Sequence, residues 1–399
     1  MKRLSTFLII LFFGLQSFSQ EYNPVVSNVI NSVDLDSLTM WLRNISGEDP
    51  VMINGVEETI DHRVDSWGND LAMEYIADVL ESYGLEPTID NYNANGKNVY
   101  ATQLGTTYPD QYYMICAHYD AVDYYCADDN GSGTAAVFEA VRILTQMSFE
   151  YSIIYALWDQ EEIGLVGSGN YAQNASNMGM DILGVINMDM IAYDSDNDMV
   201  AEIHRNSASN TVELSNYLVA IDEIYEIPVV PEVQYPGATA SDHSRFWNYG
   251  YAAVLMIEEY YGGNFNPYYH TENDRIDICN LDYFHGMSQL AIGTLSSLAS
   301  PVSFGTGVNE QFAGSPLILG NYPNPFSGQT TVTYELTNSS DLNLQLVNSQ
   351  GSTVQTLVNG LQNAGKHHYE LNVNELPKGI YFLVGTTQQG SQTHKLVIQ

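Results

Sequence analysis

Short apolar runs alternate with helical patterns through the first three quarters of the chain. Four of these runs have the length of buried strands, and they lie at 111–116, 151–158, 182–188 and 251–257. Residues 65–83 and 132–144 instead repeat their apolar positions at helical spacing. Alternation of strands and helices predicts an α/β fold, with a mostly parallel central sheet and helices on both faces.

The pattern changes after residue 317. Leu342, Leu344 and Leu346 alternate with polar residues, which is the period of a half-buried strand. Further short strands are expected at 330–336, 354–358, 368–373, 380–384 and 394–398. Short strands separated by Gly, Asn and Pro predict a small β-sandwich.

Charge supports a boundary between these two regions. The net charge is −36, and residues 21–309 hold 43 acidic and 7 basic residues, whereas 310–399 hold 5 and 3. We therefore expect a linker at 303–316 between a large domain at 20–302 and a β-sandwich at 317–399. So acidic a chain is unsuited to binding nucleic acid, which requires basic contacts to phosphate.

The first 19 residues resemble a secretory signal peptide. Lys2 and Arg3 precede an apolar core at 7–13, which small residues follow. This core is too short to span a bilayer, and no later stretch is long enough, so we expect export and no transmembrane span in the mature chain. Among the three cysteines, Cys126 and Cys279 are the pair to test for a disulfide, and Cys116 lies in a predicted strand.

Acidic residues and histidines gather where the predicted strands end. The first of the four runs leads into His118, Asp120, Asp128 and Asp129, at the start of the next helix. The other three lead into Glu161 and Glu162, into Asp189, and into Glu258 with His270 close behind. Because parallel strands place their carboxyl ends on one edge of a sheet, these side chains should meet there. Histidines together with carboxylates at one edge predict a metal site.

The residue types suit two zinc ions. Zinc binds histidine nitrogen and carboxylate oxygen, and two zinc ions can share a carboxylate and a water. The candidate ligands are His118, Asp128, Glu162, Asp189 and His270. Neighbouring glutamates point in different directions, so one of Glu161 and Glu162 can bind metal while the other takes a proton from water. Asp120 is placed to hold the second ring nitrogen of His118.

Five segments resemble the zinc exopeptidases of peptidase family M28, the bacterial leucyl aminopeptidase-like group. They occur in the family's order at 118–120, 127–133, 161–168, 187–190 and 270–274. The resemblance implies a zinc-exopeptidase-like fold over 20–302 with Asp128 bridging two zinc ions. His118 and Asp189 would complete one ion, and Glu162 and His270 the other. Glu161 would be the general base, and Asp129 would form a cis peptide after the bridging aspartate.

The activity that this resemblance implies is a secreted aminopeptidase. It would release N-terminal residues from peptides through attack by a hydroxide that bridges the two zinc ions. A carboxypeptidase of the same fold stays open, with Arg205, Arg245 or Arg275 binding the substrate carboxylate. A glutaminyl cyclase with one zinc, or an exported binding protein without catalysis, stays open as well.

The tail resembles the C-terminal sorting domain of the type IX secretion system of Bacteroidota. The similar segments are 321–326, 379–383 and 395–398. The resemblance implies recognition by that secretion machinery, export across the outer membrane, and then removal of the tail or anchoring at the cell surface. A carbohydrate-binding or adhesion sandwich is the alternative. Residues 194–198 have the spacing of a calcium loop but carry Met199 where that loop needs glycine, which favours a solvated loop.

Overall fold

The computed structural model describes residues 21–64, 66–302 and 317–398, except 323, 325, 337, 349–352, 374–375 and 388–389. The predicted signal peptide and linker lie outside these residues. None of the helices within them is long and apolar enough to cross a membrane. Cys116, Cys126 and Cys279 are all free thiols, so the disulfide considered between Cys126 and Cys279 is absent.

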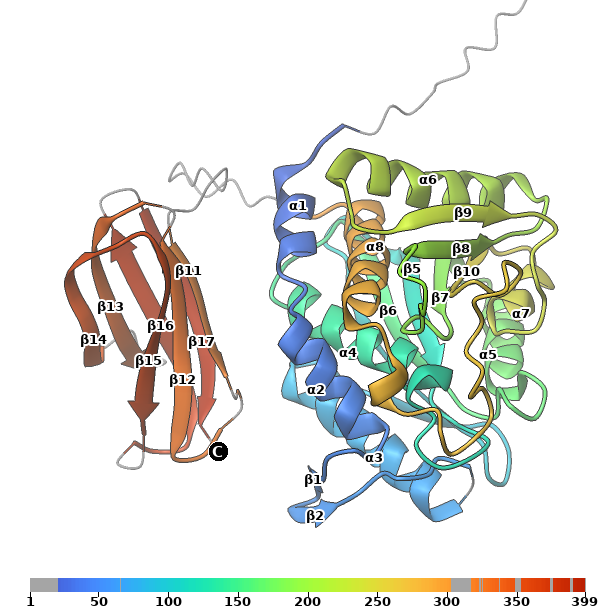
Figure 1. Cartoon of the computed structure of the whole chain (residues 1–399), viewed down its shortest axis with the longest axis horizontal. Helices are drawn as coiled ribbons and strands as arrows, with labels where there is room; N and C mark the ends of the chain where they lie inside the picture. Colours follow the sequence, from blue (N-terminus) through green and yellow to red (C-terminus); the bar gives the residue numbers. More distant parts are fainter. Residues whose placement is uncertain are drawn as a thin grey trace, which may run out of the picture.

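A mixed eight-stranded sheet forms the centre of the large domain (Figure 1). Its strands are β3 (Thr88–Asn91), β4 (Lys97–Gln103), β5 (Tyr108–His118), β6 (Tyr151–Trp158), β7 (Asp181–Met188), β8 (Val200–His204), β9 (Val230–Gln234) and β10 (Ala253–Ile257). They are ordered β3-β4-β6-β5-β7-β10-β8-β9. Four of the seven strand pairs are parallel, including the three that join β6, β5, β7 and β10. The predicted α/β fold is therefore confirmed, with antiparallel pairs toward both edges.

Helices cover both faces of this sheet. They are α1 (Pro24–Asn31), α2 (Leu35–Ile45), α3 (Ser66–Ser82), α4 (Gly133–Leu144), α5 (Val166–Met178), α6 (Ser209–Tyr225), α7 (His243–Trp247) and α8 (Leu281–Ala299). Helices α5 and α7 lie on one side of the sheet, and α1, α2, α4 and α8 on the other (Figure 1). Along β5, Ile115 and Ala117 pack into the larger apolar layer, and Met114 and Cys116 into the smaller one. Both faces of the strand are buried, which explains its continuous apolar run.

Three short elements complete the large domain. Strands β1 (Val51–Ile53) and β2 (Val56–Glu58) form a hairpin. A single turn, η1 (Ala127–Ser132), joins the segment after β5 to α4, and η2 (Ile276–Ile278) precedes α8.

The tail contains two antiparallel sheets. Their strands are β11 (Leu317–Tyr322), β12 (Gln329–Leu336), β13 (Ser340–Asn348), β14 (Thr353–Gln362), β15 (Gly365–Asn372), β16 (Gly379–Thr387) and β17 (Gly390–Ile398). The sheet orders are β11-β12-β15 and β14-β13-β16-β17. Leu342, Leu344 and Leu346 are buried between the sheets, as their alternation predicted. Strand β11 was not predicted, because it lacks alternation and depends on pairing with β12.

Candidate metal centre

The predicted site residues meet at one edge of the sheet. His118 is the last residue of β5, Asp189 directly follows β7, and Glu161 and Glu162 follow β6. These strands are neighbours in the order β6-β5-β7, so their carboxyl ends lie side by side. His270 reaches the same place from the long segment between β10 and α8.

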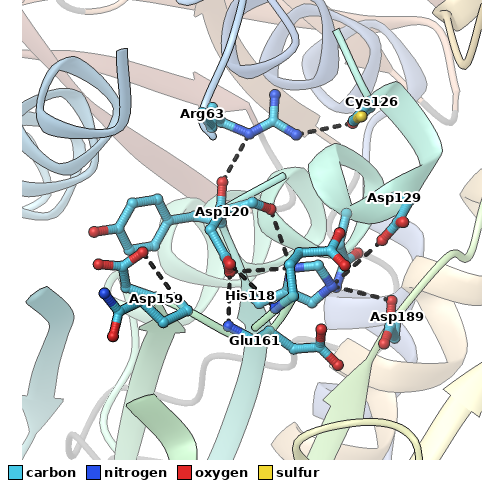
Figure 2. Close-up of polar contacts among 12 residues, drawn as sticks. Arg63, His118, Asp120, Cys126, Asp129, Asp159, Glu161 and Asp189 are labelled. Carbon is cyan, nitrogen blue, oxygen red and sulfur yellow. Dashed lines mark hydrogen bonds and ion pairs between the residues drawn. The ribbon is translucent and has the colours of Figure 1, made fainter. Parts of the chain in front are cut away.

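His118 lies at the centre of this cluster, with its side chain 1% exposed. Its Nδ1 donates to the backbone carbonyl of Asp120 at 3.1 Å and lies 3.4 Å from that residue's carboxylate. Its Nε2 lies 3.4 Å from both Asp129 Oδ1 and Asp189 Oδ1. Figure 2 shows the ring between Asp120 on one side and Asp129 and Asp189 on the other. Because Nδ1 donates its hydrogen to the carbonyl, Nε2 is the nitrogen left to bind a metal.

His270 forms a second, more exposed half of the cluster. Its Nε2 lies 3.2 Å from Asp129 Oδ2 and 3.1 Å from Glu162 Oε2. The imidazole stacks on the ring of Tyr269, with centroids 3.6 Å apart, and its side chain is 37% exposed. The two oxygens of Asp129 thus face one histidine each.

The position of Asp129 corrects the choice of Asp128 as the shared carboxylate. Asp128 turns away from both histidines, and its oxygens accept from the backbone N–H of Ala192 at 2.8 Å and from Asn266 at 3.2 Å. The cis peptide bond joins Asp129 to Asn130, one position later than the resemblance implied. The error arose because neighbouring side chains point in different directions, and only the surrounding contacts decide which one faces the histidines.

Asp120 orients both glutamates as well as His118. Its carboxylate accepts the backbone N–H of Glu161 at 3.1 Å and that of Glu162 at 3.2 Å. The predicted contact with His118 is therefore present, and the link to the glutamates is an addition that the sequence did not indicate. Through it, one side chain joins the end of β5 to the segment that follows β6.

Burial and crowding of charge shift the pKa values of this cluster. Burial raises the pKa of Glu161 to about 10, and the charges of Asp242 and Asp189 act in the same direction. Burial alone would lower the pKa of His118, but the charges of Asp189 and Glu161 raise it well above its ordinary value. In the metal-free protein, Glu161 and His118 therefore bind protons more tightly than they would in water. A bound cation would replace them, since metal binding releases protons from its ligands.

Among the candidate ligands, three buried carboxylate oxygens accept no well-aligned hydrogen bond from the residues that the structure describes. They belong to Asp129 (Oδ2), Glu162 (Oε1) and Asp189 (Oδ1). Ligands about 2.0–2.1 Å from a tetrahedral zinc ion stand about 3.3 Å from one another. The four histidine–carboxylate separations span 3.1–3.4 Å, which fits this spacing. The donor types, the unpaired oxygens and the spacing all fit zinc.

Comparison with known families assigns two parts of the chain. Residues 98–295 match the sequence profile of peptidase family M28. The chain contains a peptidase M28 domain. Residues 321–399 match the secretion system C-terminal sorting domain, so the chain also carries a tail of the kind that directs export.

Individual relatives cover only parts of the chain. Leucine aminopeptidase 1 of Uncinocarpus reesii is 26% identical over 204 residues, which cover 47% of this chain and 51% of that protein. The chain thus spans about half the length of the curated relatives that it matches.

Solved structures share the fold of the M28 domain. The LapA aminopeptidase of Legionella pneumophila is 20% identical with a TM-score of 0.62, covering 76% of this chain and 81% of that one. The glutaminyl cyclase of Macrostomum lignano is 16% identical with a TM-score of 0.56, covering 68% and 92%. The predicted fold class is confirmed, but an aminopeptidase and a cyclase share it.

Arg63 is a buried residue of the large domain that sequence reasoning missed. Its guanidinium is fully buried and donates to the carbonyls of Tyr119 at 2.7 Å and of Ile45, Tyr125 and Cys126 at 2.8 Å (Figure 2). Three of these carbonyls belong to the segment that connects His118 to η1. Carbonyl partners leave no pattern in a sequence, and the rarity of basic residues in this domain is the one signal that could have pointed to Arg63.

The three arginines considered for a carboxylate clamp have partners within the protein. Arg275 forms two hydrogen bonds with Glu48, at 2.9 and 2.6 Å, and lies over Tyr125. Arg245 donates to the carbonyl of Gly164 at 2.7 Å. Arg205 lies over the ring of Tyr235 and donates to Asn206.

The acidic segment at 194–198 forms a separate cluster. Oxygens of Asp194, Asp196 and Asp198 come within 4.8 Å of one another. Asn264 donates to both Asp194 and Asp196, at 3.3 and 2.8 Å, and the backbone N–H of Val200 donates to Asp198. Each carboxylate thus has a hydrogen-bond donor from the protein.

Proposed function

We propose that the M28 domain is a zinc aminopeptidase that holds two zinc ions. The observation that carries the proposal is the position of Asp129, whose two oxygens each face a different histidine. His118, Asp129 and Asp189 would hold one ion, and Asp129, Glu162 and His270 the other. When bound, zinc polarises a peptide carbonyl and lowers the pKa of water.

Glu161 is the proton carrier in this proposal. An oxygen of Glu161 lies within 4.8 Å of ligand atoms of both His118 and Asp189, and the residue is 9% exposed. It would take a proton from the attacking water and pass it to the leaving amine. Its raised pKa in the metal-free protein reflects burial among negative charges. Two nearby cations would lower that pKa toward the range in which the carboxylate can exchange protons at neutral pH.

Charge around the site favours a substrate with a free amine. The buried carboxylates here include Asp120, Asp189 and Asp242, and they would attract an N-terminal ammonium group. Each of the three candidate arginines for a C-terminal carboxylate already donates a hydrogen bond within the protein, which disfavours a carboxypeptidase. A glutaminyl cyclase with one zinc would need only one of the two histidines that face Asp129.

The sorting domain implies export, and we propose the type IX secretion machinery as the partner that recognises it. In this proposal residues 1–19 are a signal peptide, 20–302 the peptidase, 303–316 a linker and 317–399 the sorting domain. The mature enzyme would act on peptides outside the cell or at the cell surface.

The test is hydrolysis of a leucine chromogenic amide beside its N-acetylated twin, with the chain from residue 20 onward. We expect cleavage of the free-amine compound alone, loss of cleavage with a chelator, and recovery with zinc. Cleavage of the acetylated twin would contradict the need for a free amine. Absence of both reactions in protein that holds two zinc ions would contradict the aminopeptidase and redirect the search to C-terminal substrates.

A further inference from the structure

His270 is carried by a loop whose two ends are buried. Asn266 and Asp274 stand four residues before and four residues after it, and they are 1% and 0% exposed. His270 itself has a side chain that is 37% exposed. A ligand on an exposed loop must be held in position, and the contacts of Asn266 and Asp274 hold His270.

Asp274 binds the segment that carries Asp129. Its carboxylate accepts the backbone N–H of Asp129 at 2.9 Å and that of Asp128 at 3.2 Å. Its backbone carbonyl accepts the N–H of Ala127 at 2.9 Å. Three successive N–H groups of η1 are therefore held by one residue of the loop.

Asn266 closes the loop from its other end. Its side-chain amide donates to Asp274 at 3.1 Å and to Asp128 at 3.2 Å, and its own backbone N–H donates to Glu258 at 2.7 Å. Its amide oxygen accepts the N–H of Tyr268. The two ends of the loop are thus joined to each other and to the residue before Asp129.

We infer that Asp274 is a positioning residue that sets the distance between Asp129 and His270, and so controls binding of the zinc ion that these two share with Glu162. This inference rests on the metal ligands of the proposed function. The other ion shares Asp129, but its remaining ligands, His118 and Asp189, lie at the ends of β5 and β7 and do not need the loop. Loss of Asp274 should therefore weaken one ion more than the other.

The chemistry of the Asp274 side chain explains why asparagine would not replace it. Both carboxylate oxygens accept hydrogen bonds, from three donors in all, and the side chain donates in none of these contacts. In Asp274→Asn, an NH₂ group would face a donor, and one contact would become repulsive. The change keeps the size of the side chain, so it tests the contacts rather than the packing.

The experiment measures zinc affinity by competition with a chromogenic chelator, starting from metal-free protein. We expect Asp274→Asn to weaken the second zinc ion at least tenfold, as loss of such an outer partner typically does, and to change the first by much less. In a His270→Ala background, the same substitution should have little further effect, because the ligand that Asp274 positions is already absent. Asp277→Asn, an exposed acid in the same segment, is the matched control.

Two results would overturn the inference. One is wild-type affinity for both ions in Asp274→Asn. The other is equal weakening of both ions together with a lower unfolding midpoint of the metal-free protein, which indicates a general structural role. If Asp274→Asn does not fold, Asn266→Ala carries the same expectation. Wild-type protein that binds two ions but cleaves no amide would contradict the proposed activity and leave this inference intact.

Discussion

The M28 domain and the tail bury different kinds of side chain. At the metal edge of the large sheet, Asp128, Glu258 and Asp274 are completely buried. In the described part of the tail, the buried polar side chains are Thr330 and Thr387, and its core consists largely of leucines. Burying a carboxylate costs far more than burying a leucine unless the charge is paired.

The difference separates side chains that stabilise the fold from side chains that lower its stability. An apolar core such as that of the tail stabilises the fold. A cluster of buried carboxylates weakens the fold until a cation or a proton neutralises it, and such clusters mark functional sites. Substitutions at the metal edge should therefore lower activity without lowering stability, and substitutions in the core of the tail should lower stability without lowering activity.

The largest effect is expected at Glu161. Glu161→Gln keeps the size of the side chain but cannot take a proton, so kcat should fall about 10³-fold, equivalent to about 4 kcal/mol. Zinc content should stay at two ions, because Glu161 is not among the proposed ligands. The unfolding midpoint of the metal-free protein should not fall, because Glu161, with a pKa of about 10, is already neutral there. Glu272→Gln, on an exposed residue next to the His270 turn, is the control. A variant that remains active would exclude Glu161 as the proton carrier.

The opposite signature is expected at Leu344 in the tail. Leu344→Ala removes a fully buried side chain and should destabilise the sandwich by about 3 kcal/mol, without changing amide hydrolysis. All four tryptophans precede residue 250, so calorimetry should show a lowered tail transition while the tryptophan-fluorescence midpoint stays constant. Leu361→Ala, at a position 69% exposed, is the control. A shift in fluorescence would show that the two regions unfold together.

A smaller effect is expected at His243, a buried polar residue of the M28 domain. Burial lowers its pKa to about 3, and its Nε2 donates to the carbonyl of Ala238 at 2.9 Å. The unfolded chain takes up a proton here near pH 6.5, whereas the folded one does not, so stability is lost as pH falls from 6.5 toward 3. Between pH 7 and pH 5 this loss is about 2 kcal/mol.

The matched comparison for this prediction is His243→Gln, which keeps a donor and does not titrate. Tryptophan-detected unfolding at the two pH values should show the wild type losing about 2 kcal/mol more than the variant. Equal losses in the two proteins would show that His243 is protonated in the folded state.

The strand ends were the most predictable part of the site. The apolar runs before His118, Glu161 and Asp189 became neighbouring strands, and their ends converge because parallel pairing aligns them. The sandwich was predictable in the same way, since Leu342, Leu344 and Leu346 alternate in β13. In both regions the local pattern and the final fold agree.

The choice between Asp128 and Asp129 was less predictable. Both are buried aspartates in the same turn, and no local pattern separates them. Asn266 and the backbone of Ala192 hold the carboxylate of Asp128, which leaves Asp129 to face His118 and His270. These partners come from distant parts of the chain, so the sequence around the turn could not reveal them.

By itself, then, the sequence determined the fold class, the two regions, and which strand ends carry histidines and carboxylates, because these follow from periodicity, charge and order along the chain. The tertiary structure alone decided which aspartate faces both histidines, that Arg63 holds the segment after β5, and that Asp274 ties the His270 loop to η1. Each of these depends on the direction of a side chain or on a backbone partner far away in sequence. Residue type does not encode such contacts, and packing of the whole domain selects them.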